Sequence, residues 1–356
     1  MGFDHDRADN FAKRFMGTLN AGAVCLMVSI GHRTGLFDSM ADTTPGTSAD
    51  IAVKAGLDER YVREWLGAMV TGDIVEYDPE TKTYALPDEH AAFLTRKATP
   101  DNMAVFAQYI PLLGSVEDDI VECFKKGGGV PYSRYPRFHA VMAEDSGQTV
   151  LSSIIEHILP LVPDLKDRLD KGIQVLDVGC GAGRAINLMA ERFPNSQFCG
   201  YDLSDEAIQM GQQEAKVKNL KNVSFESRDL SVFDHDNESA QFDFITAFDA
   251  IHDQAQPRAL LKGIAQSLKP DGLFLMQDIH SSSHVHNNKD HLIGPFLYTI
   301  SCLHCMTVSL AQGGEGLGAM WGREKAQELL KEAGFNQVKI HMLDHDIQND
   351  YYIIRK

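Results

Sequence analysis

The segment from Val175 to Arg184 constrains the fold more than any other part of the chain. It reads Val-Leu-Asp-Val-Gly-Cys-Gly-Ala-Gly-Arg, and it leads from an apolar strand pattern directly into a helical pattern. Glycines at Gly179, Gly181 and Gly183 allow a tight turn and let the backbone approach a ligand closely. A strand, a glycine-rich loop and a helix in this order predict a βαβ unit with a ligand-binding loop.

The same alternation continues to the end of the chain. Strands are predicted at residues 174–177, 197–201, 223–226, 242–248, 273–278, 337–342 and 350–354, with helices at 185–193, 205–219, 257–268 and 323–333. Such alternation predicts an α/β domain, a parallel sheet with helices on both faces. Residues 279–321 are long for a loop between a strand and its helix, which is typical of lids and binding elements.

The first 100 residues predict a different domain. Helical patterns cover residues 11–30, 49–55 after the capping residue Ser48, and 59–71 after the capping residue Asp58. Two short strands at 74–77 and 83–86 then predict a hairpin, and a helix-turn-helix followed by a hairpin is the outline of a winged helix. We therefore expect a winged-helix-like domain over 1–100, a helical linker layer over 101–165 with a buried helix near 151–161, and the α/β domain over 166–356.

Charge argues against a nucleic-acid partner. The chain has 33 Lys and Arg against 50 Asp and Glu, a formal charge of −17, whereas nucleic-acid affinity comes largely from neutralising phosphates. The second helix of a winged helix reads DNA, but here Asp58, Glu59 and Glu64 balance Arg60 and Arg63. We expect this domain to form a homodimer or to cap a substrate site.

Composition also predicts the compartment. The six Cys follow no extracellular pattern, so they indicate free thiols in a reducing compartment. The polar N-terminal residues lack the layout of a signal peptide, and the longest apolar stretch, residues 22–30, is too short to span a bilayer. We expect a cytoplasmic protein without a membrane partner.

Three acids follow the first three predicted strands. Asp177 lies two residues before Gly179, where a carboxylate would repel a pyrophosphate but accept a cationic ligand. Asp202 ends the next strand about 20 residues past the loop, where a carboxylate can hold both ribose hydroxyls. Asp229 can accept a hydrogen bond from the exocyclic amine of an adenine, or else it caps a helix.

These motifs, together with Leu268-Lys-Pro-Asp-Gly272, resemble the ordered motifs of class I S-adenosylmethionine-dependent methyltransferases. The N-terminal outline resembles that of plant-type small-molecule O-methyltransferases and their bacterial and animal winged-helix relatives. The resemblance implies a Rossmann-like seven-stranded sheet with the last strand antiparallel, and S-adenosylmethionine as cofactor. It implies cofactor contacts at Asp177, Gly179, Cys180, Gly181, Gly183, Asp202, Leu203, Asp229, Leu230, Phe248 and Asp249.

The end of the fourth strand carries His252 and Asp253. In plant-type O-methyltransferases a His-Asp pair at the matching place supplies the general base, so the resemblance implies catalytic roles for both residues. The family pair is normally followed by Trp, whereas Gln254 follows here, which puts a phenolic acceptor in doubt. The alternative is that His252 makes a structural hydrogen bond or caps the helix near Pro257.

The segment 279–321 is rich in His and Cys. Cys302-Leu-His304-Cys305 lacks the paired spacing of a zinc site, so we predict buried cysteines and no metal site. We expect a helical wall of the acceptor pocket here, with candidate lining residues Phe296, Tyr298, Met306 and Trp321. We expect Phe11, Phe15 and Met16 of the N-terminal helix to be core residues along one apolar face. The alternative is that they cap the acceptor site.

The sequence therefore predicts a methyltransferase that acts on an oxygen or a sulfur of a small molecule. A hydroxyl acceptor needs a base such as His252, whereas a thiol is already partly ionised near neutral pH. N-methylation of a small amine stays open as an alternative. So does a non-catalytic regulatory or scaffold protein with a degenerate methyltransferase domain.

Overall fold

A computed structural model describes residues 2–235 and 240–356 of the chain. The chain forms two compact units, Met1–Gly114 and Ser115–Lys356.

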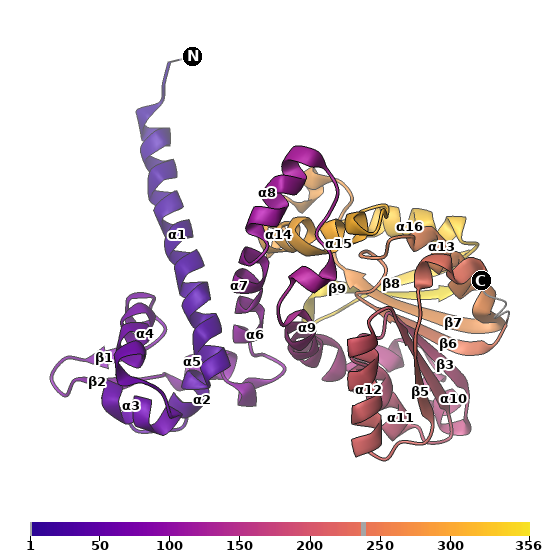
Figure 1. The fold of residues 1–356 in the computed structure, drawn as a ribbon, viewed down its shortest axis with the longest axis horizontal. Helices are drawn as coiled ribbons and strands as arrows, with labels where there is room; N and C mark the ends of the chain where they lie inside the picture. The colour runs from indigo at the N-terminus through magenta and orange to yellow at the C-terminus, as the bar shows by residue number, and fades with distance from the viewer. Residues whose placement is uncertain (1, 236–239) are drawn as a thin grey trace. The chain divides into compact units, whose positions relative to one another are not determined.

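The first unit is helical with a small hairpin (Figure 1). It contains α1 (His5–Thr34), α2 (Leu36–Met40), α3 (Ser48–Ala55), α4 (Glu59–Thr71), β1 (Glu76–Asp78), β2 (Thr83–Ala85), α5 (Asp88–Leu94), α6 (Ala104–Ala107) and α7 (Tyr109–Gly114). The Asp58 side chain caps α4, as predicted, by accepting from the N–H groups of Arg60 and Tyr61. The cap of α3 is Thr47 rather than Ser48, because Thr47 and Asp50 form a reciprocal capping box.

The core of the first unit forms where α4 meets the end of α1. The apolar face of α4 buries Trp65, whose ring lies 5.2 Å from that of Phe37 and whose Nε1 donates to the Met27 carbonyl. Gly31 permits this approach, because a Cβ there would lie 2.6 Å from the Trp65 ring. This contact between α1 and α4 is therefore fixed by one glycine and one tryptophan.

The other end of α1 is exposed. Phe11, Phe15 and Met16 are 55%, 48% and 59% exposed, and the buried residues of α1 lie between Val28 and His32. The expectation of a core stripe at these three positions is wrong within this unit. Helical periodicity reveals an apolar face, but the other elements of the unit pack only against the last turns of the helix.

Within residues 2–235 and 240–356, two helices are long and apolar enough to cross a membrane. They are His5–Thr34 and Gly294–Ala311, with mean hydropathies of 1.3 and 1.2. The first is longer than the apolar stretch considered in the sequence, because the helix continues on both sides of residues 22–30. Core helices of soluble proteins pass the same test of length and composition, so the two stretches are weak evidence for a membrane span.

The second unit is built on a seven-stranded sheet, as predicted (Figure 1). Its strands are β3 (Gln174–Val178), β4 (Gln197–Asp202), β5 (Val223–Ser227), β6 (Phe242–Phe248), β7 (Leu268–Ile279), β8 (Gln337–Leu343) and β9 (Asp346–Arg355). The order is β5-β4-β3-β6-β7-β9-β8, and β9 is antiparallel to both of its neighbours.

Helices cover both faces of this sheet. One side carries α10 (Leu165–Lys171), α11 (Arg184–Arg192) and α12 (Asp205–Val217), and the other carries α13 (Pro257–Ser267) and α16 (Gly322–Glu332) (Figure 1). Two apolar clusters fill the layers, one including Met189 of α11 and the other Ile264 of α13. A strand pattern buried on both faces is the expected signature of such a sheet.

The remaining elements are short. They are α8 (Glu117–Lys126), α9 (Phe138–Ser146), α14 (Gly294–Ile300), α15 (Met306–Ala311), π-helical turns at Gly147–Leu151, Ile154–Ile158 and Ser301–Cys305, and 3-10 turns at Arg96–Ala98, Tyr132–Arg134, Leu159–Leu161, Leu230–His235 and Val285–Asn288. The single helix predicted near residues 151–161 is instead a π turn followed by a 3-10 turn. Pro160 lies at the start of the 3-10 turn, where its ring cannot continue regular helical hydrogen bonding.

Candidate active site

The order of the strands creates a crevice at β3. This strand lies between β4 and β6, so the chain leaves β3 toward one side of the sheet and later returns to the other side. The loops that follow β3 and β6 diverge at this switch point, and ligands of open α/β sheets bind there, outside the carboxyl ends of the strands.

The glycines of the loop after β3 are required by geometry. Gly179, Gly181 and Gly183 have φ of 69°, 52° and 68°, a region that favours glycine. A Cβ on Gly179 would lie 2.5 Å from that of Ala250, and a Cβ on Gly183 would lie 2.4 Å from the Phe225 ring. Two of the glycines therefore permit close packing, while Gly181 leaves its side of the loop open.

A cavity of about 560 Å³ opens at this loop. Ten of the predicted cofactor residues line it: Asp177, Gly179, Cys180, Gly181, Asp202, Leu203, Asp229, Leu230, Phe248 and Asp249. Gly183 does not line the cavity and instead caps the start of α11. The structure therefore brings together residues from the ends of four strands that are far apart in sequence.

Two of the acids are held by backbone N–H groups. Asp202 accepts from Gly181 through Oδ2 and from Ser204 through Oδ1, both at 2.8 Å. Asp229 accepts from Ser231 through Oδ1 at 2.9 Å. A carboxylate has about four lone-pair sites, so each acid is oriented by the loops and still has capacity for a ligand.

Asp177 is the buried acid of the cavity. It is 2% exposed, and the Thr246 hydroxyl donates to its Oδ1 at 2.7 Å. Burial raises the pKa of Asp177 to about 7, although the hydrogen bond from Thr246 opposes this shift. The carboxyl group therefore changes charge near neutral pH, and a cationic ligand beside it would favour the charged form.

His252 is held by the carboxylate of Asp278, which was not among the site residues predicted from the sequence. Its Nδ1 lies 2.8 Å from Oδ1 of Asp278, and the Trp321 indole donates to the same oxygen at 2.9 Å. All three residues are buried. Because Nδ1 is engaged with the carboxylate, Nε2 is the nitrogen left to accept a proton. The sequence feature that could have identified Asp278 is its position as an acid at the end of the predicted strand 273–278, which follows the fourth strand.

The electrostatics of His252 favour its charged form. Burial lowers the pKa of His252, but Asp278 and the Cys305 thiol, which is in hydrogen-bond contact with the ring, raise it well above its usual value. His252 itself does not line the cavity, whereas the adjacent Asp253 does. The Asp253 carboxylate accepts a hydrogen bond from Tyr132, and burial raises the pKa of Asp253.

An aromatic wall, which was not predicted from the sequence, lines the same cavity as these acids. Tyr132, Tyr135, Phe138 and His139 line the cavity, and the His304 ring stacks on Phe138 at 4.0 Å. The sequence feature that could have predicted this wall is the high number of aromatic residues in Pro131-Tyr-Ser-Arg-Tyr-Pro-Arg-Phe-His139. These residues belong to the segment that was interpreted as a linker layer.

The segment 279–321 contributes less to the wall than predicted. From this segment, Gln312 lines the cavity. The four predicted lining residues do not: Phe296, Tyr298, Met306 and Trp321. Trp321 is turned instead to Asp278. The Cys305 side chain is buried in an apolar cluster, as predicted, and all six cysteines are free.

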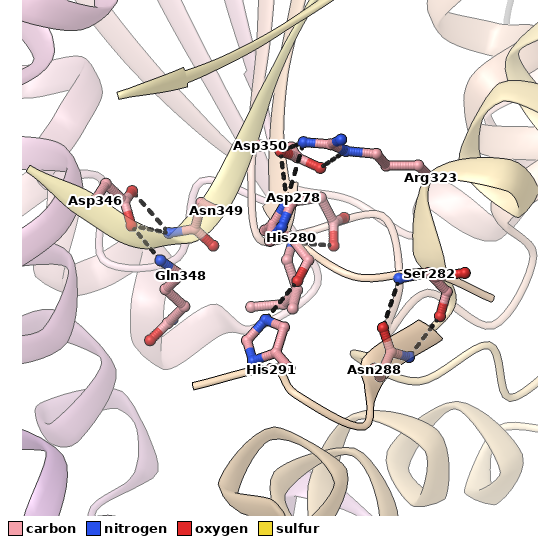
Figure 2. Close-up of polar contacts among 11 residues, drawn as sticks. Asp278, His280, Ser282, Asn288, His291, Arg323, Asp346, Gln348, Asn349 and Asp350 are labelled. Carbon is pink, nitrogen blue, oxygen red and sulfur yellow. Dashed lines mark hydrogen bonds and ion pairs between the residues drawn. The ribbon is translucent and has the colours of Figure 1, made fainter. Parts of the chain in front are cut away.

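A polar network fixes the chain just beyond Asp278 (Figure 2). Arg323 donates to both oxygens of the buried Asp350, at 2.5 and 2.6 Å, and His280 Nδ1 lies 3.0 Å from the same carboxylate. His291 Nε2 lies 2.9 Å from the His280 carbonyl oxygen. The carboxyl end of β7, and with it Asp278, is therefore tied to β9 and α16.

Two family models match the chain. Residues 22–96 match the Rv2258c-like winged HTH domain, and residues 169–334 match a methyltransferase domain. Among curated relatives, a ubiquinone biosynthesis O-methyltransferase of Idiomarina loihiensis is 28% identical over 123 residues, which is 35% of this chain and 47% of that protein. An uncharacterized protein of Rickettsia prowazekii is 31% identical over 28% of this chain and 40% of its own. The chain thus spans about half the length of the curated relatives it matches.

Solved structures match over nearly the whole chain. Human N-acetylserotonin methyltransferase in complex with S-adenosylmethionine has a TM-score of 0.71 at 16% identity, covering 100% of this chain and 99% of that one. A putative O-methyltransferase of Nostoc punctiforme has a TM-score of 0.70 at 17% identity, with coverages of 96% and 98%. The mitomycin 7-O-methyltransferase has a TM-score of 0.70 at 15% identity, with coverages of 99% and 100%.

The fold and the two matched domains define a class. Residues 22–96 match a winged HTH domain, residues 169–334 match a methyltransferase domain, and the chain has the fold of the solved methyltransferase structures.

Proposed function

We propose that this protein transfers the methyl group of S-adenosylmethionine to an oxygen or sulfur atom of a small molecule, with His252 as the general base. The observation that carries the proposal is the pairing of His252 with Asp278 at the strand end next to the cavity. A buried carboxylate on Nδ1 sets the tautomer and stabilises the imidazolium that forms when Nε2 takes a proton.

The cavity suits the cofactor. Its volume of about 560 Å³ falls in the range of small-molecule sites. Asp202 can accept from the ribose hydroxyls and Asp229 from the adenine amine, while Asp177 offers a negative charge to the cationic end of the cofactor. The cofactor supplies an electrophilic methyl group, and the protein supplies orientation and proton transfer.

Methyl transfer is an in-line displacement, so alignment and exclusion of water contribute most to the rate. The acceptor atom attacks the methyl carbon, the bond from that carbon to the cofactor sulfur breaks, and the acceptor proton passes to Nε2 of His252. The Cys305 thiol contacts the His252 ring, so the acceptor must compete with it for the base. A thiol acceptor requires less help because part of it is already ionised.

The aromatic wall points to an acceptor with an apolar or ring-shaped body. Tyr132, Tyr135 and Phe138 offer ring faces and edges, which pack well against flat molecules. A small amine is the second candidate, since Asp253 and Asp249 on the cavity wall would hold a cation.

The proposal is tested by offering labelled S-adenosylmethionine and pools of phenols, thiols and amines to the full-length protein. We expect the label to enter the phenol or thiol pool, and to do so far more slowly with His252→Gln. Label in the amine pool alone would favour the second candidate. Absence of transfer to every pool, with cofactor still bound, would favour a non-catalytic regulatory or scaffold protein.

The first unit pairs with a second copy of the chain in this proposal. Phe11, Phe15 and Leu19 expose about half of their surface along α1, and such apolar faces are commonly covered by a partner. Sedimentation velocity should show a dimer that Phe11→Ser with Phe15→Ser weakens, whereas Phe124→Ser, at an exposed position of the second unit, should not. A monomer at all concentrations would contradict this role. The six free thiols support a reducing, cytoplasmic location.

A further inference from the structure

We propose that the side-chain amides of Gln254 and Gln312 select the methyl acceptor, and that they select a ring compound with a second hydrogen-bond donor besides the group that is methylated. The inference rests on the proposed function, because it names the class of acceptor for the same cavity. Both glutamines line that cavity, and Gln312 is the residue that the segment 279–321 contributes to it.

Direct packing brings the two glutamines to one wall although they are distant in sequence. The Ser309 hydroxyl of α15 donates to the Gln254 carbonyl oxygen at 2.8 Å. In the loop after α15, a Cβ on Gly314 would lie 2.4 Å from Cα of Ala255. The glycine-rich loop after α15 therefore rests on the loop after β6, and this contact places both amides at the cavity.

The hydrogen bonds of the two amides fix which end each offers to a ligand. Nε2 of Gln254 donates to Oδ1 of Asp253 at 3.2 Å, and Nε2 of Gln312 donates to the Val308 carbonyl oxygen at 3.1 Å. A carboxylate and a backbone carbonyl accept hydrogen bonds, so the nitrogen end of each amide is the one that faces them. The oxygen Oε1 of each glutamine is then the end left for a ligand, and an amide oxygen only accepts.

These acceptor oxygens define the class of molecule. A ligand group that pairs with them must donate, as a hydroxyl or an N–H group does, and it needs no charge because the amide is neutral. The rings of Tyr132, Tyr135 and Phe138 line the same cavity and favour a flat body. A site built to bind such a donor discriminates against an analogue that lacks it, since its own polar groups are then left unpaired.

The test measures binding to the full-length protein loaded with S-adenosylhomocysteine, the demethylated cofactor, so that no transfer takes place. Catechol, resorcinol and hydroquinone are compared by calorimetry with 2-, 3- and 4-fluorophenol, in which fluorine replaces the second hydroxyl without offering a proton. The three aminophenols show whether an N–H group serves as well as a hydroxyl. At least one diphenol or aminophenol should bind about 3- to 10-fold more tightly than the matched fluorophenol.

Variants assign this preference to the two amides. Gln254→Met and Gln312→Met keep the length of the side chain and remove the acceptor oxygen, so each should bring the preference close to one. Gln213→Met is the matched control, because Gln213 is exposed on α12, and it should keep the preference of the wild type. A merely structural role of the glutamines would weaken the binding of both members of a probe pair alike and leave their ratio unchanged.

Three results would overturn the inference. The first is equal binding of the diphenols, aminophenols and fluorophenols to the wild type, or no binding of any probe at about 10 mM. The second is a preference that persists in both Gln254→Met and Gln312→Met. The third is an equal loss of preference in Gln213→Met. Transfer of label to a simple phenol without any donor preference would leave the proposed function standing, whereas a donor preference without transfer to any pool would contradict the proposed function alone.

Discussion

Charged side chains are placed differently on helix α4 of the first unit and at the end of strand β3 in the second unit. On α4 of the winged-helix unit, Arg60 pairs with Glu64 and Arg63 with Glu59, one helical turn apart and exposed to solvent. In the methyltransferase unit, Asp177 is buried and its partner is a neutral hydroxyl. Exposed charges that are already paired are satisfied without a ligand. A buried carboxylate without a cation is costly to maintain, which marks it as a functional group.

The same contrast predicts where substitutions matter. Exposed ion pairs contribute little to stability because water and salt screen them, whereas removing one member of a buried hydrogen-bonded pair leaves the other unsatisfied. Substitutions at the strand ends of the second unit should therefore have large effects, and those on α4 small ones.

The largest effect is expected for His252→Ala. If the acceptor is a hydroxyl, loss of the base should lower turnover by about 10²–10⁴. Cofactor affinity, measured by calorimetry, should change little, since His252 does not line the cofactor cavity. Wild-type turnover at every pH would show that His252 is only a structural residue.

The pH dependence sharpens this test. Burial lowers the pKa of His252, but Asp278 and Cys305 raise it above its usual value, so the base loses its proton at a higher pH than a free imidazole. Turnover of a hydroxyl acceptor should therefore rise with pH through that pKa, and the rise should vanish in His252→Ala. With a thiol acceptor, the variant's deficit should be smaller and should shrink as the thiolate forms unaided.

The next effect is expected for Asp202→Ala. The variant loses the charged acceptor of the ribose hydroxyls, and a hydrogen bond to a charged group contributes about 1.5–3 kcal/mol. S-Adenosylmethionine and its demethylated product should both bind about 10- to 100-fold more weakly in calorimetry. Unchanged affinity would remove Asp202 from the cofactor site, and micromolar binding of NAD without a response to S-adenosylmethionine would overturn the cofactor assignment.

Local patterns in the sequence predicted most of the fold. The strand at residues 242–248 and the helix capped by Asp58 were located correctly. Both depend on neighbouring residues: the strand on a run of β-branched and aromatic residues, and the helix on a capping residue followed by an apolar face. The glycine-rich loop and the acids after the strands were likewise found, since each follows its strand directly.

Contacts between distant segments were not predicted. Asp278 meets His252 only because β6 and β7 are neighbours in register, and Tyr132 meets Asp253 across 121 residues. The exposed face of α1 was also missed, because periodicity reveals an apolar face without revealing what covers it. Distances set by tertiary packing require the structure.

The stability of Asp177→Asn should depend on pH differently from that of the wild type. Burial raises the pKa of Asp177 in the folded protein to about 7, against about 3.9 in an unfolded chain. The folded state therefore holds an extra proton between these values, and its stability falls as pH rises through this window. Asparagine removes this penalty. In urea unfolding without cofactor, the stability of the variant relative to wild type should rise by up to about 4 kcal/mol between pH 4 and pH 8, since one pKa unit is worth about 1.4 kcal/mol.

The control for this measurement is Asp271→Asn at an exposed position. Its stability relative to wild type should be nearly independent of pH. A constant difference between Asp177→Asn and wild type at all pH values would mean that the carboxyl group of Asp177 keeps an ordinary pKa in the folded protein.

The smallest effect is expected on α4 of the winged-helix unit. Arg60→Gln and Arg63→Gln each remove one exposed ion pair with a carboxylate of the same helix. Because exposed pairs contribute little, each variant should unfold within about 1 °C of wild type.

If the helix read DNA, these arginines would be its phosphate or base contacts, and their loss would weaken DNA binding steeply. We therefore expect no sequence-selective DNA retention at physiological salt for wild type or either variant. Selective retention by wild type that disappears in Arg63→Gln would mean that the paired charges of the first unit are functional, and the contrast between the units would fail.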